Sequence, residues 1–253
     1  MITLLEARAV SISFGGLKAV QGVTFSIEQG EVFSIVGPNG AGKTTIFNLI
    51  SRIYECSEGS IFFEGQDITD LQTHRVAELG IARTFQNTEL FEKETVLKNL
   101  LIGCHVRRRT NFLQEIAFTS SVRDQELAFR ESVESVIDLL NLQSYRDQTV
   151  GNLSYGARKM VEVARALCTK PKLLLLDEPS SGLNPEETED LAFWIEDINE
   201  ELGITIVMVE HDMKLVAGVS DRVMAMADGQ RLLIGTPQEV QKNPEVLRAY
   251  LGD

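Results

Sequence analysis

Cysteine is scarce in this sequence, and its scarcity excludes two classes of protein. Only three cysteines occur in 253 residues, Cys56, Cys104 and Cys168, and they lie far apart and outside any CxxC or Cys/His spacing. So scattered a set predicts neither a disulfide framework nor a cysteine-based zinc site. It fits reduced thiols in a cytosolic chain.

Positive charge and long apolar runs are lacking as well. The 24 lysines and arginines are outnumbered by 37 aspartates and glutamates, which gives a net charge of −13. Because this charge repels phosphate backbones, nucleic acid is not expected as a main partner. The longest apolar run, near Leu173–Leu176, is far shorter than the roughly 20 apolar residues of a transmembrane helix. The N-terminus has no basic start, so no signal peptide is expected either.

Strand and helix patterns alternate, which predicts an α/β fold. Segments rich in β-branched and aromatic residues predict strands over 10–14, 23–27, 31–37, 60–65 and 80–85. The apolar runs over 172–179 and 203–211 are of the kind that parallel sheets bury on both faces. Residues 221–235 predict a hairpin around a DG turn. Helices are expected after Gly42, over 185–202 with a proline at the start, and as two short pieces within 236–252.

The character of the chain changes in its middle third, where apolar residues recur at helical spacing. We therefore predict a helical subdomain over 89–169, inserted into a core made of 1–88 and 170–253. Residues 105–124 carry the weakest pattern. The basic run Arg107–Arg109 predicts a solvated loop, with contact to a membrane partner or to lipid headgroups as the alternative.

The stretch GPNGAGKTT, residues 37–45, matches the phosphate-binding loop (P-loop) pattern GxxxxGK[ST] at every fixed position. It follows an apolar strand and opens a helix, so its backbone N–H groups and the helix N-terminus would face phosphate oxygens. Lys43 is expected to reach the β- and γ-phosphates, and Thr44 to bind Mg²⁺.

Polar residues follow other predicted strands. Asp177 ends LLLLD and is expected to hold Mg²⁺, while Glu178 is placed to take a proton from attacking water. His211 ends ITIVMVEH and is expected near the γ-phosphate, whereas His74 and His105 are not assigned a role. Gln86 ends GIARTFQ, and its amide is expected to reach Mg²⁺ or the water. Strand ends of this kind converge where α/β sheets bind ligands.

The segment LSYGARKMVEVA, residues 153–164, begins an amphipathic helix. Ser154 has two readings from the residues alone. Its hydroxyl can cap the helix by accepting a backbone N–H, or it can contact a ligand.

The order P-loop, Gln86, LSYG, LLLLDEP, SSGLNP, His211 resembles the ATP-binding-cassette (ABC) ATPases over residues 3–252. The resemblance implies a single ABC nucleotide-binding domain over 1–253. Its fold would be a P-loop NTPase core with an N-terminal antiparallel β subdomain and the helical insertion. ATP and Mg²⁺ are the implied ligands, with Thr44, Gln86 and Asp177 toward the metal. The implied catalytic residues are Glu178, His211 and Gln86.

Members of this family work as head-to-tail dimers that bind ATP at the interface, so a second ABC ATPase subunit, identical or different, is an implied partner. The implied ATP-binding residues are Phe14 (on adenine), Val20, Gly37, Pro38, Asn39, Gly40, Ala41, Gly42, Lys43, Thr44 and Thr45. The signature residues, acting on the other subunit's ATP, are Ser154, Tyr155 and Gly156, and the D-loop is Ser181, Gly182, Leu183 and Asn184.

The sequence departs from the usual family pattern in two places, the signature and the D-loop. The signature LSGGQ is here LSYGA, and Asn184 replaces the usual Asp of the D-loop. A working but slower signature is expected. Both departures, with FGGLKAV, VEHDMKLV and GTPQEVQKNPEVLRAYLG, resemble the ATPase subunit of bacterial branched-chain amino acid importers.

That resemblance implies two transmembrane permease subunits, an indirect link to an external solute-binding protein, and a position on the inner face of the cell membrane. Several alternatives stay open: transport of other amino acids or urea-like solutes, lipid or lipopolysaccharide export, a soluble iron–sulfur assembly ATPase, and a nucleotide-gated module without hydrolysis. The stretch between Gly42 and Ser154 is too short for the coiled coil of a DNA-repair ATPase.

Overall fold

The computed structural model describes residues 2–84, 89–110, 112–117 and 119–251. The chain divides into two compact units. The first combines Met1–Gln86 with Lys172–Asp253, and the second is Asn87–Pro171. Each unit is described by itself.

One sheet of the first unit is antiparallel, in the order β2-β1-β4-β5. Its strands are β1 (Thr3–Phe14), β2 (Leu17–Glu28), β4 (Glu58–Phe63) and β5 (Gln66–Asp67). The predicted strands 10–14 and 23–27 are therefore correct in kind and too short. The missing part of β1 alternates charged and apolar residues, and its apolar members Leu5 and Ala7 are buried. A strand with one buried face is expected to alternate in this way.

The second sheet has the order β10-β9-β3-β8-β7-β6, with every pair parallel except β9 and β10. Its strands are β3 (Val32–Val36), β6 (Ile81–Arg83), β7 (Leu173–Asp177), β8 (Thr205–Val209), β9 (Arg222–Ala227) and β10 (Gln230–Gly235). All residues of β7 and β8 are buried, which confirms the prediction of strands covered on both faces, and those of β3 are buried too. The predicted hairpin is also present, and Asp228 and Gly229 at its turn have positive φ angles of 46° and 74°, as a type I′ turn requires.

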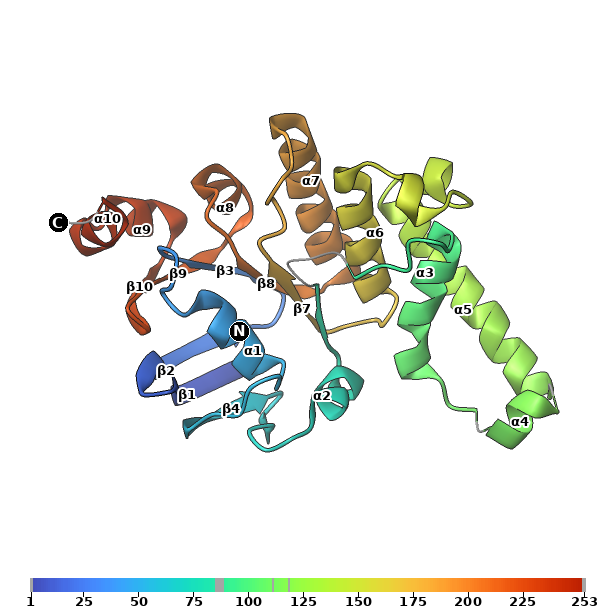
Figure 1. Cartoon of the computed structure of the whole chain (residues 1–253), viewed down its shortest axis with the longest axis horizontal. Coiled ribbons are helices and arrows are strands. Elements are labelled where there is room, and N and C mark those ends of the chain that lie inside the picture. The colour runs from blue at the N-terminus through green and yellow to red at the C-terminus, as the bar shows by residue number, and fades with distance from the viewer. Residues whose placement is uncertain (1, 85–88, 111, 118, 252–253) are drawn as a thin grey trace. The chain divides into compact units, whose positions relative to one another are not determined.

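Helix α1 (Lys43–Ile50) packs between the two sheets, where Ile46, Phe47 and Leu49 join a core with residues of both. The helices α7 (Pro185–Leu202) and α8 (Met213–Val219) lie on the other side of the six-stranded sheet (Figure 1). The bounds of α7 are those predicted. The two short C-terminal helices, α9 (Pro237–Lys242) and α10 (Pro244–Leu251), are confirmed as well. Helices α2 (Thr73–Leu79) and α8 were not predicted, since one or two turns carry little periodic signal.

The second unit is helical, as predicted. It contains α3 (Val96–Gly103), η1 (Cys104–Arg107), α4 (Phe112–Ile116), α5 (Ser120–Leu139), η2 (Gln143–Tyr145), η3 (Val150–Asn152) and α6 (Tyr155–Leu167). Across the described ranges of the chain, no helix combines the length and the apolar character that a bilayer crossing requires.

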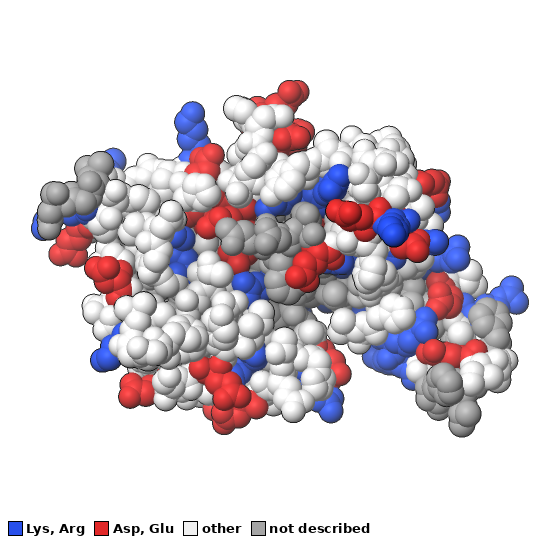
Figure 2. All heavy atoms as spheres, in the orientation of Figure 1, with Lys and Arg blue, Asp and Glu red and all other residues white. Residues whose placement is uncertain are grey.

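The arginine run of the second unit is not a solvated loop at its first two positions. The guanidinium of Arg107 donates to the carbonyl of Cys168 at 3.1 Å. Arg108 forms ion pairs with Glu115 and Glu126. The reading as a solvated loop is wrong for these two residues, because their charges hold parts of the unit together. On the face shown in Figure 2, basic side chains lie among acidic ones.

Candidate functional site

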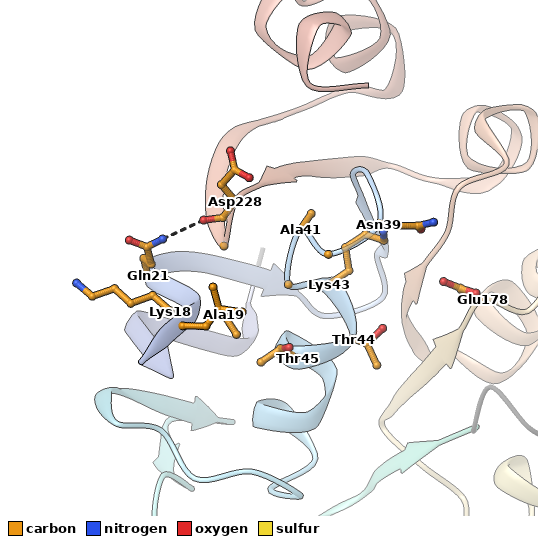
Figure 3. Close-up of a pocket in the computed structure, with 14 residues that line it drawn as sticks. Lys18, Ala19, Gln21, Asn39, Ala41, Lys43, Thr44, Thr45, Glu178 and Asp228 are labelled. Carbon is orange, nitrogen blue, oxygen red and sulfur yellow. Dashed lines mark hydrogen bonds between the residues drawn. The ribbon is translucent and has the colours of Figure 1, made fainter. Parts of the chain in front are cut away.

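A cavity of about 410 Å³ opens in the first unit, beside the carboxyl ends of the parallel strands. This volume is within the range of small-molecule sites. Figure 3 shows Lys18, Ala19 and Gln21 on one side, Glu178 on the other, and the P-loop between them. The lining residues are Leu17, Lys18, Ala19, Gln21, Asn39, Gly40, Ala41, Gly42, Lys43, Thr44, Thr45, Glu178, Asp228 and Gly229.

The P-loop curls because two of its glycines take up conformations and positions closed to other residues. Gly42 has a φ of 94°, and a Cβ there would lie 2.5 Å from the carbonyl oxygen of Ala19. At Gly37 a Cβ would lie 2.2 Å from the carbonyl oxygen of Met226. Gly42 is also the N-cap of α1, which therefore starts without a side-chain cap. The first N–H groups of α1 are thus left for another acceptor, as in an anion site.

Lys43 lies inside this loop rather than in solvent. Its side chain is 6% exposed, and its Nζ donates to the carbonyls of Gly37 at 2.7 Å and Pro38 at 3.0 Å. Burial lowers the pKa of Lys43, while the charges of Glu178 and Asp177 act in the opposite direction. The three groups are therefore close enough to interact electrostatically, as a phosphate site with a nearby base requires.

The two carboxylates at the end of β7, Asp177 and Glu178, differ in burial and in backbone conformation. Asp177, the last residue of β7, is 2% exposed, and its Oδ2 pairs with Arg83 at 2.8 Å. Glu178 lines the cavity and has a φ of 47°, a left-handed conformation that costs a non-glycine residue energy. Its N–H donates to the carbonyl of Val209 at 2.9 Å, which fixes the turn. The backbone thus aims Glu178 away from the direction that a continued strand would give it.

His211 lies two residues after Val209, the residue of β8 that pairs with Asp177 of the neighbouring strand β7. Its side chain is 57% exposed. The residue before it, Glu210, was missed in the sequence. Glu210 is fully buried, and its carboxylate accepts the N–H groups of Ser180 at 2.8 Å and of His211 at 2.9 Å. Glu210 thereby connects the loop after β7 with the loop after β8. A glutamate at the end of a buried strand was the signal available.

The side chain of Asn184 caps the start of α7. It accepts the N–H of Glu187 at 3.0 Å, and Glu187 accepts the N–H of Asn184 at 2.9 Å. Asn and Asp are about equally good at this position. The departure from the family's Asp therefore preserves the cap.

The signature residues belong to the second unit. Ser154 is the N-cap of α6, and its Oγ accepts the N–H of Ala157 at 3.2 Å. Tyr155 is 46% exposed, and its ring lies 5.8 Å from the Nζ of Lys159. Gly156 is buried. The capping reading of Ser154 is confirmed, and its contact with a ligand stays a prediction.

Several predicted residues of the nucleotide site do not belong to the cavity lining: Gly37, Pro38, Asp177 and His211, as well as Phe14 and Val20. Phe14 is 44% exposed and meets the ring of Tyr54 edge-on, with ring centroids 5.0 Å apart. Val20 is buried, while its neighbours Lys18 and Ala19 line the cavity. Gln86 lies outside the described residues.

The C-terminal helix supplies a residue that the sequence did not single out. Partial burial raises the pKa of Tyr250, and the nearby backbone of Gly37 acts in the opposite direction. The end of helix α10 therefore lies near the first residue of the P-loop.

The donor set fits a magnesium ion that is bound together with phosphate. Thr44 lines the cavity, and the carboxylate of Asp177 ends the adjacent strand β7. Within the described residues, no group of three or more His, Cys, Asp or Glu side chains is arranged to hold a metal by itself. Mg²⁺ commonly uses one or two carboxylates together with water and substrate phosphates.

Comparison with known proteins agrees with this geometry. The ABC transporter family model matches residues 20–181, and the model of the branched-chain amino acid ATP-binding cassette transporter matches residues 231–253. The chain is 40% identical to the high-affinity branched-chain amino acid transport ATP-binding protein BraF of Pseudomonas aeruginosa, over 99% of this chain and 98% of that protein. It is 38% identical to LivG of Escherichia coli, over the same shares.

Among solved structures, the chain is similar to the ADP conformation of MJ1267, an ATP-binding cassette of an ABC transporter. The TM-score is 0.87 and the identity 32%, and both chains are covered completely. The P-loop, the acidic end of β7 and these matches together show that the chain belongs to the ABC transporter family, as an ATP-hydrolysing subunit.

Proposed function

We propose that this chain binds Mg²⁺ and ATP in the described cavity and hydrolyses ATP to drive uptake of branched-chain amino acids. The observation that carries the chemistry is the convergence of Lys43, Thr44 and Glu178 on one cavity at the sheet edge. The observation that carries the solute is the similarity to BraF and LivG along nearly the whole chain.

The residues in and around the cavity are each proposed to have a separate task. Lys43 leaves the carbonyls of Gly37 and Pro38 to bind the β- and γ-phosphates, joined by the N–H groups at the start of α1. Thr44 and Asp177 would hold Mg²⁺, which supplies charge stabilisation to the phosphates. Glu178 takes the proton of the attacking water, and His211 helps to orient that water and the γ-phosphate.

The signature completes the site from a second ATPase subunit. Ser154 and Tyr155 are exposed at the start of α6, whose positive end suits a γ-phosphate held by another copy. ATP binding then closes the dimer, and hydrolysis reopens it. Two permease subunits would receive this motion and hold the chain at the inner face of the membrane, and an external binding protein would deliver the solute.

The substitution Glu178→Gln tests whether Glu178 is the general base. The matched control is Glu186→Gln, on the exposed first turn of α7. Glu178→Gln retains nucleotide binding and loses most turnover, because the amide cannot accept the proton. Glu186→Gln keeps both. Full ATPase activity in Glu178→Gln would refute the assignment.

The solute is tested by uptake. Cells that carry the chain with its native permease should accumulate labelled leucine, isoleucine or valine, and the Glu178→Gln variant should not. Uptake of a urea-like solute instead would leave the ATPase assignment intact and overturn the solute.

A further inference from the structure

Arg83 lies at the point where three parts of the first unit meet. It is the last residue of β6, beside the strand β7 that ends in Asp177. One nitrogen of its guanidinium, Nη2, donates to Oδ2 of Asp177 at 2.8 Å. The other, Nη1, donates to Oδ1 of Asn48 at 2.6 Å and to Oγ of Ser51 at 3.1 Å, near the end of the P-loop helix.

Both charges of this pair are buried. The side chain of Arg83 is 8% exposed and that of Asp177 is 2% exposed. A buried carboxylate is costly unless a cation compensates it. Arg83 therefore provides a positive charge for the carboxylate that the proposed function assigns to Mg²⁺.

We propose that Arg83 is a positioning residue that acts as the counter-ion of Asp177. In this role it stabilises the nucleotide-free chain and lowers the affinity of the site for Mg²⁺. The proposal rests on the proposed Mg²⁺ and ATP function. Its two effects follow from one contact. A guanidinium at hydrogen-bond distance pairs the carboxylate in the nucleotide-free chain, and the same positive charge repels a divalent cation beside that carboxylate.

The decisive quantity is the Mg²⁺ enhancement, which is the Kd for ATP in EDTA divided by the Kd for ATP with Mg²⁺. A residue that merely supports the fold changes stability and leaves this ratio alone. Removing the positive charge of Arg83 should raise the ratio by about tenfold, because the charge–charge repulsion at this short range is lost.

The experiment measures both Kd values by equilibrium binding, and the unfolding midpoint without nucleotide, in the full chain. Arg83→Gln removes the charge and keeps an N–H donor for Asp177. Its unfolding midpoint should fall and its Mg²⁺ enhancement should rise. Arg83→Lys keeps the charge, so its enhancement should stay within about twofold of wild type. Arg83→Met repeats the test without a donor if the glutamine variant does not fold.

Arg222→Met is the matched control. Arg222 also pairs with a largely buried carboxylate, Glu31 at 3.2 Å, and lies over an aromatic ring, Phe33, but it stands at the amino end of β9. This variant should lose stability without a change in the Mg²⁺ enhancement. A folded Arg83→Gln or Arg83→Met chain whose enhancement is unchanged or lower overturns the counter-ion role. If wild type itself shows no ATP binding or no enhancement by Mg²⁺, it is the proposed function that fails.

Discussion

The starts of α1 and α6 are built in opposite ways. Helix α1 begins at Gly42 without a side-chain cap and opens into a cavity formed by its own unit. Helix α6 begins at Ser154, whose hydroxyl already accepts the N–H of Ala157. The first N–H groups of an uncapped helix can bind an anion, whereas a side-chain cap satisfies one of these groups and stabilises the helix without an anion. This difference supports the proposal that the first unit binds the nucleotide and that the second unit presents a capped helix start to a partner subunit.

The largest effect is expected from Lys43→Ala, which should weaken ATP binding at the start of α1. The lysine amine is buried among carbonyls, and we propose that it leaves them to bind phosphate, so its loss would remove a cation from the phosphate site. ATP affinity should fall at least about 100-fold, equal to roughly 2.7 kcal/mol. Titration calorimetry measures it, and binding within tenfold of wild type would contradict the placement of the phosphates.

A second change tests whether the loops around the cavity depend on Glu210. In Glu210→Gln one carboxylate oxygen becomes an NH₂ group, which cannot accept the N–H of Ser180 or His211. Leaving a buried N–H without its acceptor should cost about 2 kcal/mol of unfolding free energy. Urea denaturation gives the value. A loss below the error of that method would mean that the two loops are held by other contacts.

Substitutions of Ser154 can distinguish its role as the cap of α6 from its proposed contact with a partner subunit's nucleotide. In the Glu178→Gln background, ATP and Mg²⁺ should drive a dimer detectable by its mass in solution. Ser154→Asp keeps the cap, so stability should change little, yet its charge faces phosphate and should weaken the dimer at least about tenfold. Ser154→Arg should abolish it. If ATP binds but no dimer forms even with Ser154 intact, the signature requires a different ATPase subunit or the permease.

The smallest expected effect concerns Asn184. Asn184→Asp preserves the capping box with Glu187 and should leave the unfolding free energy nearly unchanged. Asn184→Ala should lower it by about 1 kcal/mol. Thermal unfolding of the two variants side by side checks this. Equal midpoints would mean that the cap contributes nothing measurable here.

The sequence predicted best what is local. The P-loop, the buried strands and α7 depend on neighbouring residues, such as the glycines of 37–42 and Pro185 at the start of its helix. The contacts of Arg83 with Asp177 and of Glu210 with Ser180 join residues far apart in the sequence. No periodicity or motif marks such pairs, because they depend on strand order. The role proposed for the signature depends on a second subunit, so neither the sequence nor the structure of one chain displays it.

Strand order also has a consequence for how this protein is made. Strand β3, which leads into the P-loop, pairs with β8 and β9, both from the last fifth of the chain. The turn residue Gly229 then donates its N–H to the carbonyl of Ala41 at 3.2 Å. A ribosome must therefore release nearly the entire chain before the phosphate loop has both its neighbours. A truncated chain that ends before β8 has the complete P-loop motif and lacks both strands that pair with β3.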